Sequence, residues 1–480
     1  MVAMGFEKVV LLMRSDGGDV WDMIGGLTTT AFIQQRAWQM SRDLSTRVKY
    51  SRRRSVCCIT LLVAVFAANQ SLGEANWTTF RGPTNDGIAA PHADPPVNWS
   101  SATNIAFRTE LPGEGWSTPI VANGRIYLSA AFEKPSISND AKAESKEQKD
   151  ASRAYDLALL IVDAKSGDLL KQVTLFEQTA PARIHSKNSH ASSTPLLHGD
   201  RVYVHFGYQG TCCTDLDGTI LWTNRELSYR PVHGNGSTPV LVDNRLIFTC
   251  DGASEPKVVA LDADTGKIAW QTARLADAPK KFAFCSPTLI SVRGVQQLVS
   301  PGADCVMSLN PKNGEVIWNL DYTGYSVVPK PLYHGGKVML STSFDSPSIL
   351  AIDPTGTGNV TDTHLKWEIG KNAPQTPSML AHNGLLYSVS DGGVAMCADI
   401  ESGDVKYRKR IGGNFSASPV LAADRIYFTD EDGKTTVVQT GPKFKKLAEN
   451  DLGERTLASM AMIDDAIILR TAEALYRIEE

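Results

Sequence analysis

The sequence predicts an all-β fold, an eight-bladed β-propeller with four antiparallel strands in each blade. Three observations predict it: a strand-start motif that recurs about every 45 residues, a turn motif that follows each copy, and an unpaired strand at either end of the repeats. Four short strands repeating at that period are typical of propeller blades.

The first element is a motif similar to Ser/Thr-x-Pro at the start of a strand. Its seven copies end at Pro119, Pro195, Pro239, Pro287, Pro331, Pro377 and Pro419, and an eighth copy has Met460 in place of proline. From the second copy to the seventh the spacings are 44, 48, 44, 46 and 42, whereas the first spacing of 76 contains an insert. Proline suits this position because a strand loses no ladder hydrogen bond at its first residue.

The second element is an apolar strand that begins with a basic residue about six positions after the motif, as in Arg125–Leu128 and Arg201–Val204. Turn pairs such as Asn123-Gly124 separate it from the first strand and supply the positive φ that a tight hairpin needs. Each copy therefore predicts a hairpin.

The third element is a strand, an Asp-x-x-x-Gly turn and a fourth strand that ends in an aromatic residue. The clearest copy has Asp262, Gly266 and Trp270; two others have Asn310, Gly314 and Trp318, or Asp399 and Gly403. Aspartate caps such a turn and glycine supplies its positive φ. We expect the tryptophan to pack flat between neighbouring sheets.

The number of blades follows from the two ends of the repeat region, 104–480. The last copy contains only three strands, Met460–Ile463, Ala466–Leu469 and Ala474–Ile478. Asn104–Leu111 resembles the missing fourth strand, and its pairing with the last one would close the ring and remove an open edge. The alternative is seven blades, if the copy without proline is not a blade.

The first 75 residues are predicted to be a leader outside the fold. Arg52–Arg54 precede the apolar run Val56–Ala68, which is typical of a signal peptide around 40–75 and predicts secretion or a periplasmic location. Residues 1–39 are expected to precede the true start at Met40. The run is short for a membrane span, so no transmembrane span is expected in the mature chain, although an uncleaved anchor is the alternative. Residues 76–103 form an N-terminal extension.

Charge excludes two classes of partner. The chain has 48 basic and 52 acidic residues, and the part after residue 75 has 39 against 46, a net charge of −7. This argues against binding nucleic acid or anionic lipid. The polar segment Ser136–Arg153 predicts a solvated loop between the second and third strands of the first blade.

Cysteine and histidine give no recognisable metal site. His185 and His190 are five residues apart, which is not a known ligand spacing. His198 in a turn and His205 after a strand are expected to be exposed. Cys212-Cys213 lies in an expected strand, where neighbouring side chains point to opposite faces.

The best candidate site is one mouth of the central channel. The first strand of every blade lines this channel, so the residues just before each strand-start motif should gather there. They are Glu114, Trp116, Lys187, Asn188, His190, His233, Asn235, Lys281, Phe282, Tyr325, Gln375, Asn414, Phe415 and Arg455. Hydrogen-bonding groups mixed with aromatics are typical of ligand pockets. The alternative is that these side chains only satisfy buried backbone groups.

The Ala260–Trp270 segment resembles the tryptophan-docking motif of propellers of the pyrroloquinoline quinone (PQQ) type, over roughly 104–480. Trp77–Pro83, Lys187–His190 and His233–Gly236 resemble secreted bacterial PQQ-like repeat proteins. The resemblance implies a binding or scaffold module for a protein, peptide or glycan in the cell envelope. The alternative that it implies is a PQQ- and Ca²⁺-dependent alcohol or sugar dehydrogenase.

A PQQ-dependent dehydrogenase would need specific residues to hold its cofactor and its calcium ion. In some PQQ dehydrogenases adjacent cysteines form a disulfide stacked on the cofactor, a role that the resemblance would give to Cys212 and Cys213. The calcium-binding acidic and amide set of those enzymes has no recognisable counterpart in this sequence. We therefore favour the binding module and predict no catalytic residue, no metal ligand and no firm cofactor.

Overall fold

The computed structural model describes residues 76–135 and 153–480. The expected signal peptide and nearly all of the expected loop Ser136–Arg153 lie outside the described residues. Among those that are described, secondary structure is almost entirely β, with a 3-10 turn η1 (Gly207–Gln209) and a short helix α4 (Thr361–His364). None of these helical segments is long and apolar enough to cross a membrane.

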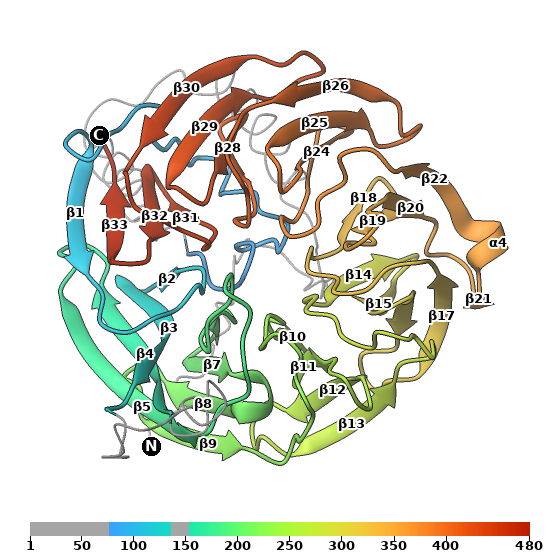
Figure 1. Cartoon of the computed structure of the whole chain (residues 1–480), viewed down its shortest axis with the longest axis horizontal. Helices are drawn as coiled ribbons and strands as arrows, with labels where there is room; N and C mark the ends of the chain where they lie inside the picture. Colours follow the sequence, from blue (N-terminus) through green and yellow to red (C-terminus); the bar gives the residue numbers. More distant parts are fainter. Residues whose placement is uncertain (1–75, 136–152) are drawn as a thin grey trace, which may run out of the picture. The chain divides into compact units, whose positions relative to one another are not determined.

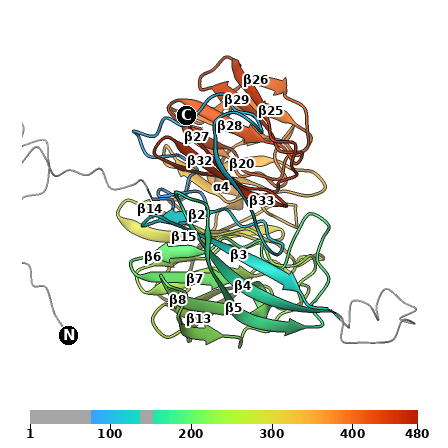
Figure 2. The ribbon, with the colours of Figure 1, turned by 90° about the vertical axis from the view of Figure 1, so that its left-hand side faces the viewer.

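Eight sheets stand in a ring around a central axis, which confirms the predicted eight-bladed propeller (Figure 1). The strands of the first four blades, from the axis outward, are β2 (Ile120–Ala122), β3 (Arg125–Glu133), β4 (Ala154–Asp163) and β5 (Leu169–Thr179); β6 (Leu196–His198), β7 (Arg201–His205), β8 (Thr211–Asp215) and β9 (Ile220–Asn224); β10 (Val240–Val242), β11 (Arg245–Cys250), β12 (Lys257–Asp262) and β13 (Ile268–Ala273); β14 (Thr288–Val292), β15 (Val295–Pro301), β16 (Cys305–Leu309) and β17 (Val316–Asp321). The long strands β3, β4 and β5 of blade 1 run out past the neighbouring blades (Figure 2).

The remaining blades repeat this order. Their strands are β18 (Leu332–His334), β19 (Lys337–Ser341), β20 (Ile349–Ile352) and β22 (Leu365–Ile369); β23 (Leu380–His382), β24 (Leu385–Val389), β25 (Val394–Asp399) and β26 (Val405–Arg410); β27 (Val420–Ala422), β28 (Arg425–Thr429), β29 (Lys434–Gln439) and β30 (Lys446–Asp451); β31 (Ala461–Ile463), β32 (Ala466–Arg470), β33 (Ala474–Ile478) and β1 (Ile105–Glu110). A short strand of blade 5, β21 (Gly358–Asn359), pairs in parallel with the outer strand of blade 4.

The N-terminal strand closes the ring as predicted. β1 pairs antiparallel with β33, from Ile105 opposite Ile478 to Glu110 opposite Ala474. The Arg108 guanidinium on β1 donates to Glu454 at 2.8 Å and to the Tyr476 hydroxyl at 3.0 Å. Because β1 supplies the outer strand of blade 8, the last sheet has the same four strands as the others.

The turn glycines receive aromatic side chains from the preceding blade. Trp222 packs on Gly266, and Trp270 packs on Gly314, where a Cβ would lie 2.4 to 2.6 Å from the indole ring. The Trp270 indole N–H also donates to the Pro311 carbonyl at 3.1 Å. The expectation that these tryptophans pack between sheets is therefore confirmed for both.

Trp318 is an exception to this packing. Its indole N–H donates to the side-chain oxygen of Gln297 within its own blade, at 2.8 Å. The extra strand β21 pairs with β17 directly at Trp318. The ring is fully buried there, so the insertion in blade 5 takes the place of the usual inter-blade contact.

The strand-start motif of blade 6 is shifted from its predicted register. The sequence pattern aligns Pro377 with the other prolines, but β23 begins at Leu380, so Met379 occupies the position equivalent to Pro419. Ser378 then takes the place of the motif hydroxyl, and its backbone N–H donates to Ser418 Oγ at 2.9 Å. Inter-blade hydrogen bonding, which the local sequence does not reveal, sets this register.

The N-terminal extension crosses the channel end that is opposite the predicted mouth. Trp77 forms a β-bridge with Val121 in blade 1, and Ile88 forms one with Leu421 in blade 7. The Thr78 carbonyl accepts the backbone N–H of Leu197 in blade 2 at 2.9 Å. The blue trace after residue 76 accordingly passes through the centre of the ring in Figure 1.

Candidate functional site

A belt of hydroxyl groups surrounds the channel two positions before each first strand. In six places the backbone N–H of one blade donates to the hydroxyl of the next, at 2.8 to 3.1 Å. The belt residues are Thr118, Thr194, Thr238, Ser286, Ser378, Ser418 and Ser459, with Lys330 in the corresponding place of blade 5. The motif hydroxyls thus satisfy buried backbone groups between blades.

The channel above this belt is a cavity of about 430 Å³. All seven belt hydroxyl residues line it, and Phe80 of the N-terminal extension lines it as well. Because the extension crosses the channel beyond the belt, the cavity ends there and opens at the predicted mouth. Its volume lies within the range of small-ligand pockets.

One side of the cavity is an arc of aromatic rings. His185, His233, Phe282, Tyr325 and Phe344 follow one another with ring centroids 5.3 to 6.4 Å apart. They come from the mouth loops of blades 2 to 5. Burial and the neighbouring His185 lower the pKa of His233, which favours its neutral form. The arc therefore offers an apolar and mostly uncharged surface.

An ion pair links two distant blades at the mouth. Lys187, before the first strand of blade 2, contacts Glu431 of blade 7 at 2.7 Å. The Ser416 hydroxyl donates to the same carboxylate at 2.7 Å. Glu431 is only 13% exposed, and the contact joins the loops of blades 2 and 7 at the mouth.

Two buried cations lie on the far side of the belt. The Arg81 guanidinium donates to the carbonyls of Pro419 and Met379, each of which directly follows a belt serine. Lys330 Nζ contacts Asn85 Oδ1 at 3.1 Å. Arg81 is 2% exposed and Lys330 is 5% exposed. Burial and the charge of Arg81 lower the pKa of Lys330 to about 7.

The cavity does not fit a calcium-bound quinone. Calcium takes oxygen ligands, mostly carboxylates and amides, and no Asp or Glu of the described segments lines the cavity. Within 76–135 and 153–480 no group of three His, Cys, Asp or Glu residues could hold a metal ion. The cavity wall offers hydroxyls, aromatic rings, the Asn188 amide and the Lys187 amine instead.

Cys212 and Cys213 are both free and fully buried on β8. Cys212 belongs to the hydrophobic cluster between blades 1 and 2, and Cys213 belongs to the one between blades 2 and 3. Burial raises the pKa of each thiol to about 12. They face opposite sides of the strand, as the sequence argument expected, and neither lines the cavity.

About half of the expected mouth residues meet at this cavity. Those that line it are Trp116, Lys187, Asn188, His233, Phe282 and Tyr325. The others are not among its lining residues: Glu114, His190, Asn235, Lys281, Gln375, Asn414, Phe415 and Arg455. Local packing explains why some expected residues do not line the cavity, as Glu114, His190 and Gln375 illustrate.

Glu114 forms a β-bridge with Ala131, which draws its segment against blade 1. The His190 ring packs on Tyr155 of blade 1 at a centroid distance of 4.7 Å. Gln375 lies three positions before the belt serine of blade 6, because the motif there is shifted by two residues. Its backbone N–H donates to Asp391 instead.

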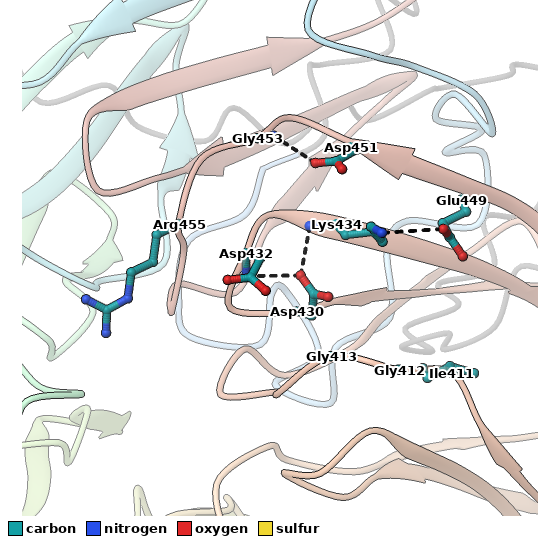
Figure 3. A pocket seen from close by; sticks show the side chains of 10 residues that line it. All are labelled: Ile411, Gly412, Gly413, Asp430, Asp432, Lys434, Glu449, Asp451, Gly453 and Arg455. Carbon is teal, nitrogen blue, oxygen red and sulfur yellow. Dashed lines mark hydrogen bonds and ion pairs between the residues drawn. The ribbon is translucent and has the colours of Figure 1, made fainter.

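Arg455 borders a second hollow, of about 540 Å³, at the loops of blades 6, 7 and 8. Figure 3 shows its side chain pointing away from the acidic residues there. Its guanidinium lies 5.6 Å from the ring centroid of Trp116. Asp430 in the same hollow accepts the backbone N–H groups of Asp432 and Lys434, so its carboxylate holds a turn.

The prediction that His205 is exposed is wrong. It is the last residue of β7 and is 1% exposed, with its ring centroid 4.0 Å from that of Phe248. Burial lowers its pKa to about 3, so the ring is neutral. The strand continues through His205 because the next residues fold back at once through η1. His198 is exposed, as predicted.

Four aromatic lining residues were not predicted as part of the mouth: Phe80, His185, Phe284 and Phe344. Phe284 directly precedes the strand-start motif of blade 4, so its position was a usable signal. Phe344 comes from the loop between the second and third strands of blade 5, which the repeat pattern does not describe. Phe80 belongs to the non-repeating extension.

Comparisons with known proteins agree with this architecture. A family model described as outer membrane protein assembly factor BamB matches residues 150–272, 258–381 and 366–474, which together cover more than half of the chain. BamB of Yersinia pestis is 21% identical over 281 residues, covering 45% of this chain and 67% of that protein. The chain spans about half (52%) of two other curated relatives, uncharacterized proteins of Rickettsia.

Solved structures show the same fold at low identity. BamB from Moraxella catarrhalis matches with a TM-score of 0.51 and 12% identity, over 78% of this chain and 99% of that one. Quinohemoprotein alcohol dehydrogenase from Comamonas testosteroni matches with a TM-score of 0.56 and 13% identity, over 84% and 80%. Binding proteins and oxidoreductases can share one propeller fold, so the site must decide the function.

Proposed function

Because the chain belongs to the PQQ-like propeller family described as outer membrane protein assembly factor BamB, we propose that it is a binding or scaffold module of the cell envelope. The ligand, a protein segment, peptide or glycan, enters the cavity at the channel mouth. The name of the Yersinia relative, an assembly factor of outer membrane proteins, supports an envelope location.

One observation supports this function above others: the cavity combines an arc of aromatic rings with a wall that lacks any carboxylate. Aromatic rings provide stacking and apolar contact area, and the belt hydroxyls with Asn188 provide hydrogen bonds for orientation. The basic side chains among these lining residues are Lys187, which is paired with Glu431 at 2.7 Å, and His185 and His233, which contact each other at a centroid distance of 5.4 Å.

The first experiment separates the binding module from a dehydrogenase. PQQ and Ca²⁺ are added to the purified protein, and the bound-quinone absorbance and alcohol-dependent dye reduction are recorded. We expect neither signal above that of a heat-denatured control. Alcohol-dependent turnover would overturn the proposal in favour of a quinoprotein dehydrogenase.

The second experiment locates binding. The protein is screened against a displayed peptide library and a glycan array, in parallel with Phe282→Ala and with the control Phe444→Ala. Phe444 packs on Tyr407 at the outside of the ring, so the control removes an equal ring without touching the cavity. We expect binders that lose affinity only in Phe282→Ala. Binders that are insensitive to Phe282→Ala would place the site elsewhere.

A further inference from the structure

The cavity floor contains hydrogen-bond donors that the protein does not use. Six belt hydroxyl oxygens, including those of Thr194, Thr238 and Ser378, accept a backbone N–H. A hydroxyl can also donate its own proton. Within the described parts of the chain, no acceptor is seen for the O–H groups of the belt, and these residues are 2% to 7% exposed.

The two cations behind this belt have no ion-pair partner in the described part of the chain. Among the described residues, no carboxylate lies within 4 Å of Arg81 or Lys330, whose contacts are carbonyl and amide oxygens. Asp86 acts on both cations only at longer range. Gly87 is required here, because a Cβ would lie 2.1 Å from the Arg81 guanidinium. Burial of charge without a counter-charge is unfavourable and normally calls for compensation.

These features together describe a receptor for an anion with an apolar body. The belt donors and the positive charge behind them favour negatively charged oxygen atoms. The aromatic arc from His233 to Phe344 favours a planar or apolar group. Among the described residues no carboxylate lines the cavity, and the one at its mouth, Glu431, is paired with Lys187.

We propose that the cavity binds an organic carboxylate, with the carboxylate against the hydroxyl belt and the apolar body against the aromatic arc. This inference rests on the proposed function and names the ligand chemistry of the same site. A carboxylate of this kind is supplied by the C-terminus of a peptide or by a free aromatic acid. The experiment separates the two sources.

Binding is measured by calorimetry at pH 6, where Lys330 carries its proton, with two matched pairs of probes. The first pair is 3-phenylpropionate and its amide, and the second is a pentapeptide ending in phenylalanine with a free or an amidated C-terminus. We expect the acid of at least one pair to bind at least tenfold more tightly than its amide. If the acid binds more tightly than the amide only in the peptide pair, the ligand is a peptide C-terminus. If the acid binds more tightly in both pairs, a free aromatic acid is enough for binding.

Three variants test whether the belt hydroxyls and the buried lysine favour binding of the carboxylate. Thr118→Val removes a belt hydroxyl that accepts no hydrogen bond from another described blade residue, and the Thr118 backbone N–H still donates to Thr194. Lys330→Met removes one cation at similar length, and Lys409→Met on the exposed outer strand of blade 6 is its control. We expect Thr118→Val and Lys330→Met to reduce the acid-to-amide ratio at least threefold, while Lys409→Met leaves it unchanged.

The outcomes separate the two proposals. Equal binding of acid and amide, lost in Phe282→Ala, would overturn the carboxylate assignment and leave the binding module intact. An acid preference that persists in both Thr118→Val and Lys330→Met would also overturn it. If none of the four probes binds, while the peptide or glycan screen still finds binders that depend on Phe282, the carboxylate assignment is overturned as well. Quinone turnover would overturn the proposed function itself.

Discussion

Replacement of Lys330 by methionine tests the account of the buried cations through the pH dependence of stability. Lys330 is 95% buried, and burial together with the charge of Arg81 lowers its pKa from 10.5 to about 7. The charged and titratable groups that act on it are Arg81, Asp86 and Cys285. The pKa of the lysine in the unfolded chain stays near its ordinary value.

The direction in which the unfolding free energy changes with pH follows from the protons bound in the folded and unfolded states. Between pH 7 and 10.5 the unfolded chain holds the lysine proton and the folded chain does not, so the contribution of Lys330 to stability rises with pH. Below pH 7 both states are protonated and the full penalty of the buried charge is present. Between pH 7 and 9 the contribution changes by about 2.7 kcal/mol, at about 1.36 kcal/mol per unit.

Methionine does not titrate, so the advantage of Lys330→Met over the wild type should be largest at pH 6 to 7 and should fall by about 2 to 3 kcal/mol by pH 9. The lost hydrogen bond to Asn85 costs about 1 kcal/mol at every pH and does not affect this slope. The assay is urea unfolding of both proteins by circular dichroism at pH 6, 7, 8 and 9. A stability difference that is constant across this range would refute the reasoning.

Two further predictions concern the ring itself. Arg274→Met should lower the unfolding free energy by about 3 to 5 kcal/mol, because it leaves the carboxylate of Asp251 buried without its partner at 2.6 Å; urea titration checks this, and a loss below about 1 kcal/mol would contradict it. Gly167→Ala should lower the melting temperature more than Gly199→Ala. Both glycines have positive φ, but a Cβ at Gly167 would lie 2.7 Å from Phe107 of the closing strand, whereas Gly199 has open space. Equal losses in a thermal melt would argue against the packing of this strand.

Much of the fold could be predicted because propeller blades repeat. Ser193, Thr194 and Pro195 recur in similar form at a near-constant period, so each copy supports the assignment of the others. Closure was predictable as well, because a three-stranded last copy requires a fourth strand, and Ile105–Glu110 resembles such a strand just before the first copy.

The site was predictable only where it depended on the repeat. Residues that directly precede a strand start, such as Trp116 and Phe282, lie on the cavity wall. Arg81 and Phe80 come from a segment that occurs once, so no period indicates that it crosses the channel. Lys330 stands where other blades have a hydroxyl, and its burial depends on Asn85, 245 residues away in the chain.

The most direct test of the central claim is photo-crosslinking from the cavity wall. p-Benzoylphenylalanine is placed at Phe282, and separately at Leu221 on the exposed outer strand of blade 2, and each protein is irradiated with a peptide or glycan ligand obtained from the screen. The account predicts covalent adducts from position 282 and none from position 221. Adducts from position 221 alone would contradict it and would place the binding surface on the rim of the propeller.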